Sequence, residues 1–270
     1  MITTSNSPRP RWTIILATGA LHLLALLAFL PGNFNWSAVG VALLLHWMTI
    51  GLGISLGFHR LASHRSLRVP QCLEYFLIFC GTLAAQGAVI GWVGYHRMHH
   101  LHVDQPLDPH DSTKGLWWSH ISWLMHEVPA KTELSQFTQD ITHEPFYLFC
   151  HQHYVALQVG LAVLLYGLGG MPFVVWGIFV RLFVGFHSTC CVNSVCHKFG
   201  YRSYATRDRS TNCWWVALLT FGEGWHNNHH ACQSSAQFGW QWWEIDLVWQ
   251  MIRLLQRLKL ATKVRVLHKS

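Results

Sequence analysis

Histidines gather in three short clusters whose spacing is typical of metal ligands. The clusters are His59-Arg-Leu-Ala-Ser-His64, His96-Arg-Met-His-His100 and His226-Asn-Asn-His-His230. In the second and third clusters the histidines fall at i, i+3 and i+4, so a helix presents all three rings on one face. The first cluster spaces its histidines by five residues, which an α-helix would splay apart. We therefore expect at least one of those two rings where a helix ends or unwinds, and we predict that the clusters bind metal.

Isolated histidines need a different interpretation. The chain contains 20 histidines, so some must fall near one another by chance. For single rings such as His22, His46 and His187, packing or hydrogen bonding is favoured over ligation. Coincidence is nevertheless a poor account of three clusters in one chain.

The composition places these clusters in a membrane protein. Of the 270 residues, 51% are hydrophobic and 11% are charged, against roughly 25% charged in a soluble domain. No Asp, Glu, Lys or Arg occurs between Trp12 and Phe58, or in the run 145–180. The first run is broken at 31–37 and the second at 167–172, which leaves stretches long enough to cross about 30 Å of hydrocarbon. We predict four transmembrane helices in two hairpins, at roughly 12–30, 38–58, 153–169 and 172–193.

A further stretch without charge runs from Tyr75 to Tyr95 and could by length also cross the membrane. A crossing there would put the first and second histidine clusters on opposite faces, where they could not share a site. We therefore predict an interfacial or re-entrant helix at roughly 72–92, which contains Gly81, Gly87 and Gly91. Each hairpin returns the chain to its starting side. The predicted fold is an all-α integral membrane protein, one domain over 1–270, with a helical cap formed by 96–145 and 197–270.

Basic residues indicate that the cap and both termini are cytoplasmic. The predicted outer loops carry no charge. The basic residues that flank the predicted spans on the other side are Arg9, Arg11, Arg60, Arg65, Arg68, Lys198, Arg202, Arg207 and Arg209. The net charge of +7 is assigned to contacts with anionic headgroups and not to nucleic acid. The first apolar stretch lacks a small-residue cleavage site, so we expect a retained span. The eight cysteines form no Cys-x-x-Cys pair and are expected to be reduced.

The number of clustered imidazoles exceeds the needs of one ion. A zinc site uses three or four protein ligands, and the three clusters supply eight, so we predict two metals. Ligand type alone leaves iron, zinc and copper open. Two redox-active irons that activate oxygen beside a membrane suit an unactivated hydrocarbon substrate, for which hydrolytic zinc has no use. The full pattern of the soluble di-iron proteins, two Glu-x-x-His motifs with further glutamates, is absent, so histidine would supply the ligands.

At these residues the chain resembles the membrane fatty-acid desaturases, most closely the Δ9 branch with its stearoyl-CoA and acyl-lipid enzymes. The resemblance runs from about Trp36 to the C-terminus. Besides the clusters it rests on Gln86, Trp92, Asp108-Pro-His-Asp-Ser, Trp117-Trp-Ser-His120, Val192-Asn-Ser-Val-Cys-His197, Asn212-Cys-Trp-Trp215 and Gly222-Glu-Gly-Trp-His. The form Gly222-Glu-Gly-Trp-His-Asn-Asn-His-His and the short N-terminus are more similar to the acyl-lipid enzymes than to the animal CoA enzymes.

The resemblance implies a di-iron centre with nine histidine ligands: His59, His64, His96, His99, His100, His197, His226, His229 and His230. It adds a water held by Asn193, and it places Gln86, Trp92 and Thr189 along a bent acyl tunnel. The family has tryptophan after this threonine, where the chain has Cys190. We therefore expect a reshaped tunnel and an altered chain-length or double-bond preference. The loop histidines His102, His110 and His120 are expected to orient ligands or contact headgroups.

The resemblance further implies an oxygen-dependent desaturase that introduces a cis double bond at Δ9 of a saturated C16 or C18 acyl chain. The reduced di-iron centre would activate O2 and remove hydrogens from two neighbouring methylenes, with water as the second product. Electrons would come from ferredoxin in the acyl-lipid branch or from cytochrome b5 in the CoA branch. The expected location is a bacterial or cyanobacterial plasma or thylakoid membrane, with a glycerolipid as the substrate.

Two other classes share some of these features. A histidine-rich di-iron hydroxylase has the same metal chemistry and differs in its product. A metal transporter or sensor would place ligands near the middle of its spans, whereas these clusters fall at the predicted cytoplasmic ends.

Overall fold

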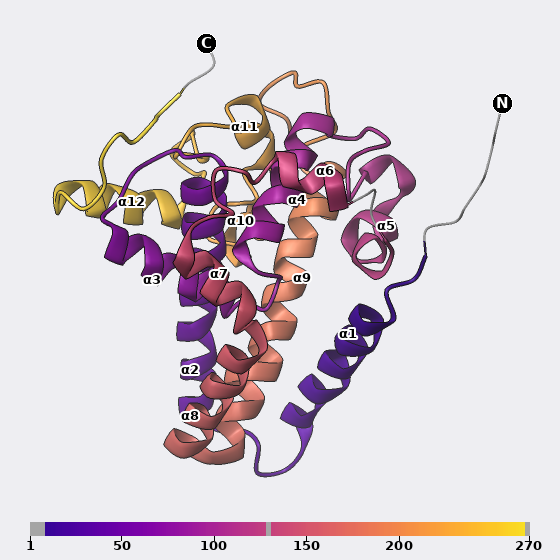
Figure 1. Ribbon diagram of the computed structural model, residues 1–270, viewed down its shortest axis with the longest axis vertical. Helices are drawn as coiled ribbons and strands as arrows, with labels where there is room; N and C mark the ends of the chain where they lie inside the picture. The colour runs from indigo at the N-terminus through magenta and orange to yellow at the C-terminus, as the bar shows by residue number, and fades with distance from the viewer. Residues whose placement is uncertain (1–8, 128–130, 268–270) are drawn as a thin grey trace.

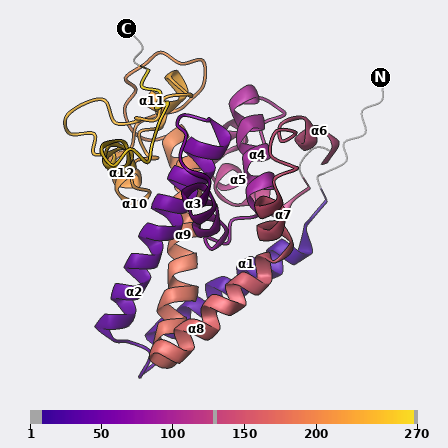
Figure 2. The same ribbon diagram turned by 60° about the vertical axis from the view of Figure 1, so that its left-hand side comes forward.

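The computed structural model describes residues 9–127 and 131–267, and within these residues it is helical throughout, with isolated bridges in place of strands. The helices form two regions (Figures 1 and 2). One region gathers α1, α2, α8 and α9, and the other gathers α4, α5, α6 and α11. The predicted all-helical class is confirmed for the described residues.

Three helical stretches are long and apolar enough to cross a membrane: Trp12–Phe29, Trp36–Ser63 and Tyr154–His197. The first comprises α1 (Trp12–Ala25) and η1 (Leu26–Phe29); the second comprises α2 (Trp36–His46) and the π-helical η2 (Trp47–Ser63). The third comprises α8 (Tyr154–Val174), η5 (Val175–Val180), α9 (Arg181–Ser194) and η6 (Val195–His197). Their large apolar side chains are widely exposed, as expected of surfaces that face lipid.

The third stretch is broken where the sequence predicts a turn between two spans. Gly169 and Gly170 have non-helical backbone angles, with a φ of +66° at Gly170. Beyond them the chain turns back, and Gly177 in η5 packs closely against Leu165 in α8. The number of membrane crossings and their orientation stay predictions.

The segment predicted as one helix at 72–92 forms two. α3 (Gln71–Thr82) ends before a connection at 83–88, and α4 (Val89–His102) begins after it. Ala85 and Gly87 both have positive φ, of 56° and 96°, which a helix cannot accommodate. The break lets α3 lie along η2 while α4 carries the second histidine cluster.

The remaining elements are short helices of the second region. They are η3 (Ser112–Lys114), α5 (Leu116–His120), η4 (Ser122–Met125), α6 (Lys131–Gln136), α7 (Pro145–Gln152), α10 (Trp214–Leu219), α11 (His226–Ala231) and α12 (Leu247–Arg257). The start of α1 is joined to them, because Arg11 N donates a hydrogen bond to Met125 O at 2.7 Å.

η2 is the central element of the packing. Of its residues, those from Thr49 to Ser63 are buried with the exception of Leu52, and they separate two apolar clusters, one around Phe58 and Ile78 and one around Leu56 and Ile252. Gly53 lies against the backbone of Gly81 in α3, so closely that an added Cβ would be 2.3 Å from Gly81 N. This contact fixes η2 against α3.

Candidate metal centre

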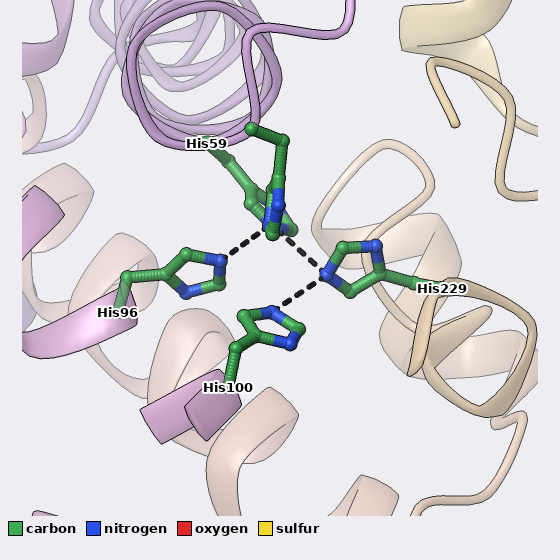
Figure 3. A group of neighbouring side chains, drawn as sticks. His59, His96, His100 and His229 are labelled. Atoms are coloured by element: carbon green, nitrogen blue, oxygen red, sulfur yellow. Dashed lines mark hydrogen bonds between the residues drawn. The ribbon is translucent and has the colours of Figure 1, made fainter. Parts of the chain in front are cut away.

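The nine histidines predicted as ligands come together in two groups. Group A consists of His59, His64, His96, His100 and His229, and group B consists of His99, His197, His226 and His230. Within each group the candidate ligand atoms all lie within 4.8 Å of one another. Figure 3 shows four rings of group A, those of His59, His96, His100 and His229, pointing toward one another.

The two histidines of the first cluster lie close together because η2 is a π-helix. His64 N donates to His59 O at 3.1 Å, an i+5 bond that places residues five apart on the same side. The two ring centroids are 4.9 Å apart. His64 itself follows the last residue of η2, as expected for a ring at a helix end.

The second and third clusters each serve both groups. In α4, His96 and His100 belong to group A and His99 to group B; in α11, His226 and His230 belong to group B and His229 to group A. The i, i+4 pairs have ring centroids 4.5 Å and 4.1 Å apart. The sequence placed all three rings of a cluster on one face, but it did not show that each helix passes between two groups.

Nitrogen atoms converge within both groups. His229 Nε2 lies 3.0 Å from His59 Nε2 and 2.9 Å from His100 Nε2. His64 Nε2 is 2.7 Å from His96 Nε2, and in group B His197 Nε2 is 3.1 Å from His226 Nε2. The Nε2 atoms of His99 and His230 are buried without a hydrogen-bond partner.

Carboxylates hold several of these rings by the opposite nitrogen. His99 Nδ1 is 3.0 Å from Asp108 Oδ1, His230 Nδ1 is 3.0 Å from Asp208 Oδ2, and His59 Nδ1 bonds to Glu223 Oε2. His197 Nδ1 lies 3.5 Å from Asp104 Oδ1. A ring that donates Nδ1–H to a carboxylate presents its Nε2 lone pair to the centre, which is the usual arrangement of a metal-binding histidine.

These carboxylates were missed as functional residues in the sequence, although Asp108 and Glu223 lie in its motifs. Asp104 and Asp208 stand 93 and 22 residues from the histidines they contact, and neither has a spacing signal. Only the fold brings them to the rings.

Burial favours the neutral form of several imidazoles of the two groups. Burial lowers the pKa of His64, His96, His100, His226 and His229 well below the usual value, and their mutual repulsion as cations adds to this. Burial and the neighbouring His110 lower the pKa of His99 to about 3, against the opposing effect of Asp108. Neutral imidazoles are the form that binds a metal ion.

Asparagines fix the short helix α11. Asn212 Oδ1 accepts hydrogen bonds from the backbone N–H of Asn227 at 3.0 Å and of Asn228 at 3.2 Å, which caps the start of the helix. The Asn228 amide donates to Phe238 O and Glu244 Oε2, both at 2.9 Å. These bonds set the direction of His226, His229 and His230.

Two cavities meet the histidines. A small one of about 40 Å³ is lined by rings of both groups, including His59 and His226. A larger one of about 520 Å³ lies between α1, α4 and α9 and is lined mostly by apolar atoms. Both cavities share Trp92, Thr189 and Asn193 in their walls. The larger volume falls in the range of small-molecule and cofactor sites.

The four residues predicted to contact substrate, Gln86, Trp92, Thr189 and Cys190, all line the larger cavity. Gln86 Nε2 donates to Thr189 Oγ1 at 2.9 Å and to Gly185 O at 3.2 Å. These bonds tie the connection 83–88 to α9 and so shape the cavity wall. Their contact with a substrate stays a prediction.

The single histidines are hydrogen-bonded, as predicted. His22 Nε2 is 3.0 Å from His187 Nε2, and His187 Nδ1 is 3.0 Å from His120 Nε2. His46 Nε2 donates to Leu219 O at 3.0 Å. His110 is closer to the centre than expected for a loop histidine, because it lies 3.7 Å from Asp108 Oδ1 and lines both cavities.

The donor set fits two divalent transition-metal ions. Five and four imidazoles converge in two separate groups, and the unpartnered Nε2 atoms of His99 and His230 would be costly to bury without a cation to satisfy them. Fold and site together therefore define a helical, membrane-type protein with two histidine metal groups beside an apolar cavity.

Comparison with known proteins gives the family. The family model described as fatty acid desaturase matches residues 34–259. The chain is 57% identical to the sn-1 stearoyl-lipid 9-desaturase of Anabaena variabilis, over 100% of this chain and 99% of that protein. It is 58% identical to the enzyme of the same name from Synechocystis sp., over 95% and 81%, and 47% identical to the sn-2 palmitoyl-lipid 9-desaturase of Nostoc sp., over 96% and 92%. The chain belongs to the fatty acid desaturase family, which confirms the resemblance seen in its motifs.

Proposed function

We propose that this protein is an oxygen-dependent di-iron acyl-lipid 9-desaturase. It introduces a cis double bond at Δ9 of a saturated C16 or C18 chain esterified to a membrane glycerolipid. The observation that carries the proposal is the shared wall of Trp92, Thr189 and Asn193, which joins the two histidine groups to an apolar cavity. Relatives named for lipid-bound 9-desaturation support the substrate and the position.

The nine histidines are the proposed metal ligands. Group A would hold one iron and group B the other, and Asn193 would hold a water nearby. Iron bound there supplies the one-electron chemistry that activates O2, which no side chain of this site can supply alone. The protein contributes position, because one methylene pair must be selected among many that are chemically alike.

The cavity residues provide that position. Gln86 and Thr189 fix the wall beside the histidines, and Trp92 stacks on His96 with ring centroids 5.1 Å apart. An acyl chain in this cavity passes the metal groups at a depth set by these side chains. Cys190, in place of the bulkier tryptophan, leaves more room at the bend.

The membrane arrangement is also a proposal. Four spans in two hairpins place the histidine groups and both termini on the cytoplasmic side, where ferredoxin delivers electrons one at a time. The basic residues that flank the spans favour an acidic donor, which also leaves cytochrome b5 as the alternative.

Expression in a host that supplies ferredoxin tests this function. Gas chromatography–mass spectrometry of total lipid fatty acids should reveal a new Δ9 monoene, with the double bond located by disulfide adducts. His229→Ala should give no product, because it removes the ring that contacts both His59 and His100. The matched control is His151→Ala, an exposed histidine that should leave the product unchanged.

Each other outcome identifies a different function. A hydroxylated chain would move the protein to the hydroxylases. Product from a CoA-bound acyl chain alone would replace the lipid substrate, and full activity of His229→Ala would contradict the metal assignment.

A further inference from the structure

The two histidine groups differ in the charge that surrounds them. Three rings of group B have a carboxylate near Nδ1. His99 is hydrogen-bonded to Asp108 and His230 to Asp208, both at 3.0 Å, and His197 lies 3.5 Å from Asp104 without a hydrogen bond. In group A only His59 has one, Glu223, among the described residues. Group A therefore has more rings and fewer carboxylates.

The carboxylates of group B are not neutralised by basic side chains. Asp104, Asp108 and Asp208 form ion-pair contacts only with histidines in the described part of the chain. They are held instead by neutral donors: the backbone N–H of Arg209 bonds to Asp104, that of Asp104 to Asp108, and that of Ser210 to Asp208. Their charge therefore acts on the histidines.

The carboxylate of group A is shared with a cation. Arg60 is fully buried and lies 3.7 Å from Glu223 and 3.1 Å from Asp246. The net charge next to group A is therefore −1, from the two carboxylates of Glu223 and Asp246 and the guanidinium of Arg60. The net charge of the three aspartates next to group B is −3. In a buried site that difference acts directly on a bound cation, because little water screens it.

We infer that group B is the tighter of the two metal sites and the first to fill, and that Asp104, Asp108 and Asp208 are the positioning residues that make it so. Carboxylates that orient a ligand histidine raise its basicity, and their loss typically weakens metal binding by about 10–100-fold. With two more such contacts, group B should bind a divalent ion at least about tenfold more tightly than group A. At limiting metal, chains would hold the group B ion alone.

This inference rests on the proposed two-metal function but is tested without turnover. The full chain is purified in lipid nanodiscs, stripped of metal and titrated with Zn2+ alone against a chelator of known affinity. Two classes of site are expected, one ion each. Asp208→Asn should weaken the tight class about 10–100-fold, while Glu223→Gln should weaken the other class and leave the tight one.

Two further variants test whether the effect on metal affinity comes from the carboxylates next to the histidines. Asp140→Asn is the matched control, because Asp140 pairs with Arg65 and Arg97 and not with a histidine; it should change neither class. Asp104→Asn repeats the test if Asp208→Asn does not fold, as judged by circular dichroism and gel filtration.

The outcomes separate the inference from the function. Two equal sites, or a tight class weakened by Glu223→Gln and not by the aspartate variants, would overturn the asymmetry and leave the desaturase proposal intact. Unequal sites in a protein that desaturates no lipid would keep the asymmetry and refute the function. Failure to bind two ions would refute both.

Discussion

The histidine groups and the large cavity lie side by side, but they differ in how tightly their residues are packed. Most rings of the two groups are buried, and those of His59, His99 and His230 are held by a carboxylate. The cavity has α1 as one wall, and α1 contains no buried residue at all. A metal site depends on fixed distances between ligands. A cavity for a long flexible chain depends on shape and access, so its wall can be lightly packed.

The largest effect is expected from a substitution of Gly53 in η2, where η2 packs against α3. A Cβ there would meet the backbone of Gly81 and Cys80 in α3 at 2.3–2.5 Å. Overpacking typically costs about 1–3 kcal/mol and occasionally more, and here backbone must move. We expect Gly53→Ala to lower the unfolding temperature sharply and to abolish metal binding. Thermal unfolding of Gly40→Ala, where nothing lies within 4 Å of the added Cβ, is the control.

A milder test removes the cap of α11. Asn212→Ala deletes two hydrogen bonds to the helix start and a 2.7 Å bond to Asn228. We expect a loss of about 0.5–2 kcal/mol from the cap and a larger relative loss of bound metal. Asn35→Ala, which removes the N-cap side chain of α2, is the comparison. Equal metal content in the two variants, measured by mass spectrometry, would show that α11 needs no cap to hold its rings.

On the cavity side, Cys190→Trp should change the product and not the fold. Cys190 is 3% exposed and lines the large cavity, so an indole there would fill part of that cavity. We expect a shift toward shorter chains or another double-bond position in the fatty-acid profile. Cys72→Trp, at an exposed position, should change nothing. An unchanged profile for Cys190→Trp would place this residue outside the path of the acyl chain.

The smallest effect is expected on α1. Ala17 lines the cavity, whereas Leu16 is 69% exposed and does not. Ala17→Trp should reduce product roughly threefold, less than 1 kcal/mol in the barrier, because a lightly packed helix can give way. Leu16→Trp should have no effect. A loss as large as that of a ligand variant would mean that α1 is as fixed as the histidine groups.

Much of the site could be predicted from residues close together in the sequence. The i, i+3, i+4 spacing of His96–His100 and His226–His230, and the apolar runs that became the three membrane-capable stretches, are local patterns. The break at Gly169–Gly170 was also visible, because glycine and proline interrupt helices. Local periodicity failed at 72–92, where Ala85 takes a positive φ that its side chain does not predict.

By itself, the sequence determined which side chains can bind metal and which segments can lie in a membrane, because residue type and helical period decide both. Only the tertiary structure decided how those histidines divide. The π-helical turn joins His59 to His64, and α4 and α11 each send rings to both groups. It also brought Asp104, Asp208 and Glu223 to the rings. The contacts of these carboxylates join residues far apart in the chain, and their free energy depends on packing that no local pattern encodes.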